Sequence, residues 1–108
     1  MSSYAAAVFS PHGKIFEGAI ESLVAPGAEG FFEVLGSHAP LVALLNQGIM
    51  KITQDTKQLY FATGTGVLEV NQQHQVSLLV DFAIPATNRN DASEKLQKDH
   101  SEAFLQSR

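Results

Sequence analysis

Turn-forming residues recur along this chain roughly every eight to twelve positions, and the segments between them are short and rich in Val, Ile, Leu and Phe. This spacing is typical of an all-β sandwich or barrel and leaves little room for long helices. The 108 residues, 44% of them hydrophobic, suffice for one domain with a single core and a short appendage. We therefore expect a mainly β fold.

The apolar segments place the expected strands. Alternation puts Leu59 and Phe61 on one face of their strand. In the later strands it likewise groups Leu68 with Val70, and Val76 with Leu78 and Val80. In the long second segment, Phe16, Gly18, Ile20, Ser22 and Val24 share a face, opposite Glu17 and Glu21. We expect strands over about 4–10, 14–25, 30–35, 41–45, 49–54, 58–63, 67–71 and 76–80, with a break at Pro26-Gly27, a hairpin loop at Asp55-Thr56-Lys57 and another hairpin around 72–75.

A polar segment after Pro85 has the signals of a helix over about 91–106. Asp91 and Glu94 have capping-box spacing, with Asp91 expected as the N-cap. Asp91 with Lys95, and Glu94 with Lys98, are expected i,i+4 pairs. The apolar stripe is weak, so we expect the helix to dock loosely or to move; its members are Ala92, Leu96, Ala103 and Phe104, interrupted by His100.

Charge and composition exclude several classes of protein. Seven basic against eleven acidic residues give a net charge of -4 without a basic stripe, so we expect no nucleic-acid partner. The apolar runs are too short to span a bilayer, and the hydrophobic fraction is too high for a disordered chain. The absence of cysteine excludes disulfides and thiol chemistry, and the N-terminal residues lack the features of a secretory signal, so we expect the mature chain to start here and to stay cytosolic.

A search for catalytic or metal-binding patterns finds little. The histidines His12, His38, His74 and His100 lack the spacing of a metal site. Ser37 and His38 are adjacent and would point apart in an extended chain, Gly64-Thr65-Gly66 lacks the rest of a phosphate-binding motif, and Glu17 and Glu21 would lie roughly 13 Å apart on a strand. We therefore expect no cofactor and no enzymatic activity, and favour a binding or structural module.

Two adjacent phenylalanines, Phe31 and Phe32, follow a glycine-rich loop. Neighbours on a strand point to opposite faces, so only one of them enters the core of a two-layer sandwich, and the other is exposed or covered by a partner. The alternative is a bulge that lets both pack inside.

Several segments resemble the epsilon subunit of F-type ATP synthases, called delta in mitochondria. They are Phe16–Gly30, His38–Leu45, Gly48–Ile52, Gly66–Val70 and Leu78–Ala83 with Val76, and the resemblance covers about Tyr4 to Ala86. It implies a flattened ten-stranded β-sandwich domain over 1–86. The helix expected from the residues then lies in a short C-terminal helical tail over 87–108. It also implies a non-catalytic rotor subunit, peripheral to the membrane on the cytoplasmic face of a bacterial inner membrane or its organellar equivalent.

The same resemblance implies partners, namely the gamma subunit and the c ring, with which the subunit would turn. The loop facing the c ring would comprise Ala28, Glu29, Gly30, Phe31 and Phe32. The segment facing gamma would comprise His38, Ala39, Pro40 and Leu41.

Four departures from the family pattern bear on these expectations. Phe31 and Glu33 stand where the family usually has an acidic or polar residue and a glycine, Gly36-Ser37 replaces Pro-Gly, and Thr65-Gly66 replaces a glycine pair. Typical members also continue into two long helices that restrain ATP hydrolysis and in some cases bind ATP, whereas about 20 residues follow the sandwich here. We therefore expect no ATP binding and little hairpin-type inhibition. The alternative function is a free-standing β-sandwich that binds a small ligand or a peptide.

Overall fold

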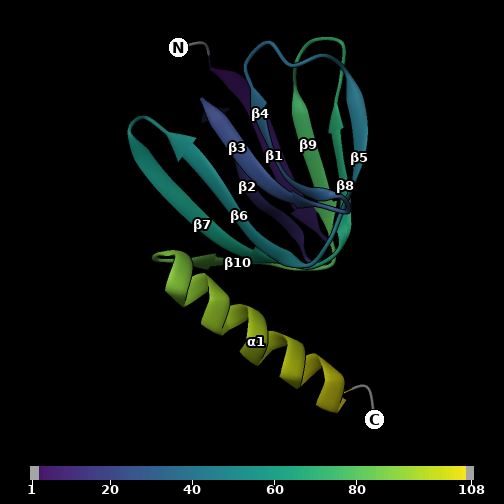
Figure 1. The fold of residues 1–108 in the computed structure, drawn as a ribbon, viewed down its shortest axis with the longest axis vertical. Helices are drawn as coiled ribbons and strands as arrows, with labels where there is room; N and C mark the ends of the chain where they lie inside the picture. The colour runs from purple at the N-terminus through teal and green to yellow at the C-terminus, as the bar shows by residue number, and fades with distance from the viewer. Residues whose placement is uncertain (1–2, 107–108) are drawn as a thin grey trace.

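Ten strands and one helix make up the fold in a computed structural model that describes the backbone of residues 3–106 and side chains as far as Gln97 (Figure 1). The elements are β1 (Tyr4–Ser10), β2 (Gly13–Ile20), β3 (Ser22–Gly27), β4 (Gly30–Leu35), β5 (Leu41–Leu45), β6 (Gly48–Gln54), β7 (Lys57–Thr63), β8 (Gly66–Val70), β9 (Val76–Val80), β10 (Ala83–Ala86) and α1 (Arg89–Gln106). The expected mainly β fold with ten strands and one C-terminal helix is confirmed.

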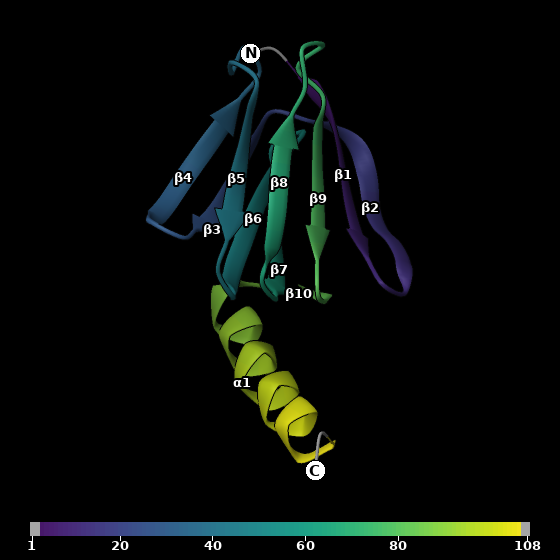
Figure 2. The same ribbon diagram turned by 90° about the vertical axis from the view of Figure 1, so that its right-hand side faces the viewer.

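The strands follow one continuous path that wraps into a sandwich. Their order is β10-β7-β6-β3-β5-β8-β9-β1-β2, with β4 paired to β3 beside this path. Only β1 and β9 pair in parallel, and the pairings found among the other described strands are antiparallel. Figures 1 and 2 show β3, β6 and β7 in one layer and β5, β8 and β9 in the other, while α1 projects from one end.

The core lies between the layers, and in β8 and β9 it contains the residues that alternation assigned to the inner face. Leu68, Val70, Val76, Leu78 and Val80 are all buried, as expected. The largest fully buried hydrophobic side chains come from seven strands in both layers: Val8, Ile20, Leu23, Val34, Met50, Ile52, Leu68 and Leu78. This close packing makes the sandwich a stiff body.

The expected single strand over 14–25 is wrong, because the chain breaks at Glu21 into β2 and β3. Glu21 donates its N–H to the carbonyl of Thr53 at 2.9 Å, and its carboxylate accepts the N–H of Asp55 at 2.7 Å. The break shifts the alternation, so that Leu23 and Ala25 are buried in β3 where Val24 was expected to be.

The turn positions differ from expectation by one or two residues. Pro26 and Gly27 belong to β3, and the break expected there lies at Ala28 and Glu29. The β6–β7 loop is a two-residue turn of Asp55 and Thr56, both with positive φ, so Lys57 already belongs to β7. Both hairpins are otherwise present as expected.

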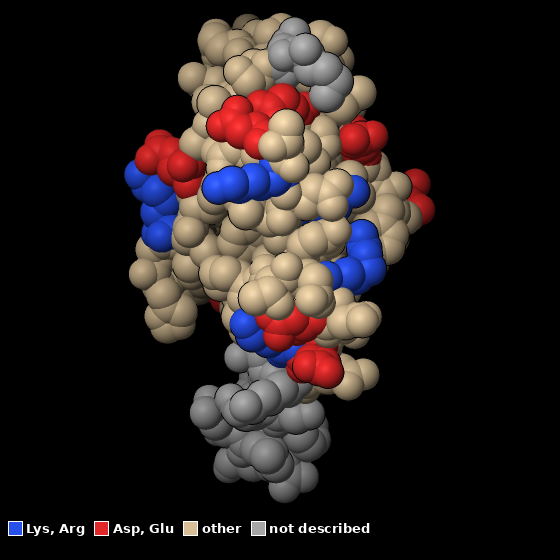
Figure 3. Space-filling model, turned by 90° about the vertical axis from the view of Figure 1, so that its left-hand side faces the viewer, with Lys and Arg blue, Asp and Glu red and all other residues tan. Residues whose placement is uncertain are grey.

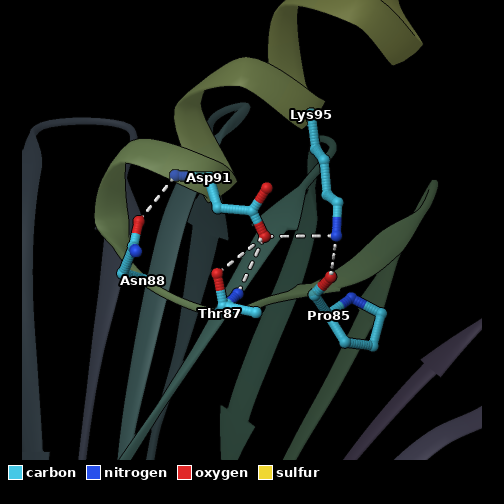
Figure 4. Close-up of polar contacts among 5 residues, drawn as sticks. All are labelled: Pro85, Thr87, Asn88, Asp91 and Lys95. Carbon is cyan, nitrogen blue, oxygen red and sulfur yellow. Dashed lines mark hydrogen bonds and ion pairs between the residues drawn. The ribbon is translucent and has the colours of Figure 1, made fainter.

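Helix α1 starts two residues earlier than expected, because Asn88 is the N-cap instead of Asp91 (Figure 4). The carbonyl of Asn88 accepts the first helical bond from the N–H of Ala92, and its side chain accepts the N–H of Asp91 at 2.8 Å. Asp91 instead accepts the N–H of Thr87 at 2.8 Å and pairs with Lys95 at 3.2 Å. The expected Asp91–Lys95 pair is thus confirmed, with Asp91 in the first turn.

The start of α1 packs on the end of the sandwich formed by β6, β7 and β10. Ala92 is fully buried there, and the guanidinium of Arg89 lies 5.6 Å from the centre of the Tyr60 ring. The loose docking of the helix stays a prediction. The remaining expectations for this helix, which concern Lys98, His100, Ala103 and Phe104, lie outside the described side chains.

Candidate functional site

Glu17 and Glu21, the two carboxylates considered above as a catalytic pair, have local structural partners. Glu17 pairs with Lys14 at 2.6 Å, and Glu21 binds the backbone of Asp55. Ser37 and His38 lie in the segment before β5. Within the described residues, no three His, Cys, Asp or Glu side chains are arranged to hold a metal ion.

The glycines around Thr65 serve close packing of the backbone. A Cβ on Gly66 would overlap the backbone oxygen of Leu79, and a Cβ on Gly64 would lie 2.9 Å from the ring of Phe82. At Gly66, β8 and β9 therefore approach each other more closely than a larger residue would allow, and Gly64 leaves room for the Phe82 ring. The hydroxyl of Thr65 donates to the carboxylate of Asp81 at 2.8 Å, which links the β7–β8 connection to the β9–β10 connection.

Charge is mixed on the part of the surface shown in Figure 3, where Lys and Arg alternate with Asp and Glu. Such a face offers no single-sign field for attracting a polyanion. Within the described residues, no helix has both the length and the apolar character needed to cross a bilayer.

A groove of about 440 Å³ lies between the β3–β4 turn and β5. Residues 27–32 form one wall and residues 42–44 the other. Figure 2 shows β4 and β5 separating from each other toward this turn. All five residues that the sequence assigned to the c-ring-facing loop, Ala28, Glu29, Gly30, Phe31 and Phe32, line this one groove.

Phe31 and Phe32 point to opposite sides, as alternation predicts. Phe31 is 64% exposed, whereas Phe32 is half-buried and packs against the core. The alternative, in which a bulge brings both rings inside, is wrong, because β4 pairs with β3 in an unbroken register from Gly30 to Leu35.

The four residues assigned to the gamma-facing segment lie at the other end of β5 from the turn. Ala39 and Pro40 are exposed, and Pro40 and Leu41 line a second, shallower depression of about 350 Å³. The imidazole of His74 lies with its Nδ1 3.0 Å from the carbonyl oxygen of His38, which ties this segment to the β8–β9 loop. The two assigned segments are therefore not in one cluster, but β5 joins them and Val42 lines both depressions.

An exposed apolar surface extends from the groove across three strands, and the sequence analysis missed it. Leu44 pairs with Val67, and Val67 pairs with Leu79, so the three side chains form a row across β5, β8 and β9. Val42 is 70% exposed, Leu44 66% and Leu79 64%. The signal was the run of five apolar residues at 41–45, because a strand in a two-layer sandwich can bury only alternate side chains.

A buried side-chain hydrogen bond connects β1 to β4. The hydroxyl of Tyr4 donates to the carbonyl of Val34 at 2.6 Å. Burial, and to a lesser extent the charge of Glu33, raises the pKa of Tyr4 well above its ordinary range. This bond fixes β4, and with it one wall of the groove, to β1.

Comparison with known proteins places this geometry in context. The family model described as the ATP synthase delta/epsilon chain, beta-sandwich domain, matches residues 4–86. An ATP synthase epsilon chain of Leptospira interrogans is 32% identical over 108 residues, covering 92% of this chain and 84% of the relative. An epsilon chain of Acinetobacter baumannii is 38% identical over 100 residues, covering 91% and 70%.

Solved structures share the fold at lower sequence identity. A chain in the mitochondrial ATP synthase of Euglena gracilis, solved as an OSCP/F1/c-ring assembly, matches all of this chain and 68% of its own length, with a TM-score of 0.76 and 22% identity. A chain in the central stalk and c ring of the Tetrahymena thermophila mitochondrial ATP synthase matches 77% of this chain, with a TM-score of 0.66 and 15% identity. At these identities the likeness concerns the fold.

Proposed function

This chain belongs to the delta/epsilon family of ATP synthase subunits, and on that premise we propose that it is a rotor subunit of the central stalk. In this role it binds the gamma subunit and the c ring, turns with them and helps couple ion flow to ATP synthesis. The names of its bacterial relatives and the central-stalk assemblies that contain its structural neighbours support this proposal.

The observation that supports the role most is the exposed apolar surface on a stiff sandwich. Three side chains, those of Phe31, Val42 and Leu44, are exposed around one groove, and Leu79 continues the surface two strands away. Exposed apolar patches of this kind mark protein interfaces. A subunit that transmits torque needs such adhesive surfaces and a rigid body, and it needs no reactive group, so we propose that the chain itself is non-catalytic.

We assign the two ends of β5 to different partners. The groove residues Ala28, Glu29, Gly30, Phe31 and Phe32 face the c ring, and the segment His38, Ala39, Pro40 and Leu41 faces gamma. The division of the chain into a sandwich domain over 1–86 and a helical tail over 87–108 is part of the same proposal. It is supported by the extent of the family match and by the start of α1 at Arg89.

Attachment to the membrane would be indirect, through the c ring, on the cytoplasmic face of a bacterial inner membrane or its organellar equivalent. The bacterial origin of the relatives supports this location. We also propose that the chain requires no cofactor.

Native co-purification tests the proposed role. The full chain, tagged at one end, is expressed in its own organism, and membranes are solubilised in a mild detergent before capture. We expect gamma and the c subunit in the captured complex, because the apolar surface is covered there. Capture of the chain without gamma would contradict the rotor role and favour a free-standing module.

A further inference from the structure

The connection between β10 and α1 consists of Thr87 and Asn88, and both are bonded to the helix that follows. Thr87 donates its N–H to the Asp91 carboxylate at 2.8 Å and its hydroxyl to the same oxygen at 3.2 Å. Asn88 accepts the N–H of Asp91 on its side chain and the N–H of Ala92 on its carbonyl. The connection is therefore folded back onto the first turn of α1 and has little freedom to act as a hinge.

Lys95 extends this network from the helix to the sheet (Figure 4). Its Nζ lies 3.2 Å from the Asp91 carboxylate and donates to the carbonyl of Pro85 at 3.0 Å. Pro85 belongs to β10 and is paired with Phe61 of β7. The bond from Lys95 therefore joins the second turn of α1 directly to a strand of the sandwich.

A second set of contacts holds the start of α1 against β7. The Arg89 guanidinium lies 5.6 Å from the centre of the Tyr60 ring, a distance at which a cation is attracted to the ring face. Ala92 is fully buried, and Leu96 is half-buried one turn later. Because Lys95 is held by β10 and Arg89 by β7, a change in the direction of α1 would break at least one of these contacts.

An exposed ion pair on its own would not fix a helix. Pairs at i,i+4 such as Asp91 and Lys95 typically contribute little, since solvent screens them. Here, however, Asp91 also accepts the backbone and hydroxyl donors of Thr87, and Lys95 reaches another element. The two side chains thus belong to a network that crosses from helix to sheet, and a network holds its geometry better than an isolated pair.

We propose that Asp91 and Lys95 form a clamp that locks α1 at one angle to the sandwich. The helix then projects from the end of the sandwich as a rigid arm, in the direction seen in Figures 1 and 2. The clamp opposes the loose docking expected from the weak apolar stripe of this helix. It is a property of the chain itself, and in the proposed rotor it makes α1 turn with the sandwich at a constant angle.

Distances between spin labels on the isolated full chain, measured by pulsed electron paramagnetic resonance, test the clamp. The chain has no cysteine, so labels are placed at the exposed Gln97→Cys of α1 and at either His12→Cys or Gln72→Cys of the sandwich. The β1–β2 and β8–β9 turns that carry these two sandwich positions lie at opposite ends of the sandwich (Figure 2), so the two distances report different tilts of α1. We expect narrow distance distributions for both pairs, because α1 has a single direction.

Three substitutions are then introduced into the labelled chains. Asp91→Ala removes the acceptor of the clamp and Lys95→Met removes its donor, while Glu94→Ala is the matched control at an exposed position of the same helix. Alanine and methionine are both strong helix formers, so α1 itself persists, which circular dichroism verifies. We expect both clamp variants to widen the distance distributions about twofold and Glu94→Ala to leave them unchanged.

Broad distributions in the unmodified chain would overturn the proposal and favour loose docking. Distributions that stay narrow in both clamp variants would overturn it as well, since the burial of Ala92 and the contact of Arg89 with Tyr60 would then suffice to hold the helix.

If Asp91→Ala loses helical signal, Lys95→Met decides, because it leaves the bonds from Thr87 to Asp91 in place. A narrow distribution for Lys95→Met contradicts the clamp. None of these results bears on the rotor role, which co-purification tests separately.

Discussion

Truncating the two adjacent phenylalanines separates a surface role from a core role at neighbouring positions. Full burial of a phenylalanine side chain contributes up to about 3 kcal/mol. Phe31 retains 64% of its accessible surface, so folding buries about a third of it, and Phe31→Ala should reduce the free energy of unfolding by about 1 kcal/mol. For a domain of this size that loss lowers the melting temperature by about 5 °C.

Phe32 packs against the core and lies against Gly27, so its removal leaves a space beneath the turn. Phe32→Ala should cost about 2 kcal/mol, between the loss at an exposed site and the 3–5 kcal/mol typical of fully buried phenylalanine. Its melting temperature should fall by about 10 °C, roughly twice the fall for Phe31→Ala.

The assay monitors thermal unfolding of the full chain by circular dichroism. Binding to a detergent-solubilised complex of gamma and the c ring is measured in parallel. We expect Phe31→Ala to weaken binding about tenfold despite its small effect on unfolding. A melting temperature for Phe31→Ala as low as that of Phe32→Ala, or undiminished binding by Phe31→Ala, would refute the assignment of Phe31 to the contact surface.

Four further predictions concern contacts elsewhere in the fold. Tyr4→Phe should cost about 1–2 kcal/mol because it leaves the carbonyl of Val34 without its 2.6 Å donor. The raised pKa of Tyr4 also predicts that the unmodified chain loses stability as the pH rises above about 10, where the unfolded chain ionises and the folded one does not; chemical denaturation of Tyr4→Phe should show a shallower alkaline decline, and an equal decline would contradict this. Gly66→Ala should cost about 2 kcal/mol or more, since its Cβ would overlap the backbone of Leu79, and a melting temperature equal to that of the unmodified chain would show that the strands can separate. Asn88→Ala removes the N-cap of α1 and should cost about 1 kcal/mol, seen as earlier loss of helical circular dichroism on heating, whereas unchanged melting would mean that the first turn of α1 does not need this cap.

Most of the strand pattern was predictable from the sequence because a two-layer sandwich imposes alternation. The segments 41–45 and 76–80 have the expected bounds, and burial alternates along both of them. The break at Glu21 was not predictable in the same way, because no glycine or proline marks it. Its cause lies more than thirty residues away, in the bonds from Glu21 to Thr53 and Asp55.

The start of the helix shows a different limit. Asn88 and Asp91 are both good N-cap residues, and local spacing favoured Asp91 because Glu94 follows it. In the structure, the side chain of Asp91 turns back to Thr87 while Asn88 caps the helix. The N–H of Thr87, and to a smaller extent Lys95, lower the pKa of the Asp91 carboxyl. The contacts of Asp91 with Thr87 and Lys95 therefore favour the ionised carboxylate.

The candidate site was predictable in part. Adjacent phenylalanines in one strand required one of them to face outward, and the structure identifies it as Phe31. The convergence of Phe31 with Val42 and Leu44 was not predictable, since it depends on contacts of β3 and its turn with β5. Long-range pairing therefore builds the groove from two segments that lie apart in the sequence.

Co-rotation with gamma is the central claim, and a cross-link tests it most directly. The chain has no cysteine, so Pro40→Cys provides a single thiol on the exposed segment assigned to gamma, to be paired with a cysteine introduced into gamma in the assembled enzyme. If the two subunits turn together, complete cross-linking should leave the rate of ATP hydrolysis by the complex unchanged. A rate that falls in proportion to the yield of the cross-link would show that they move relative to each other and would contradict the rotor role.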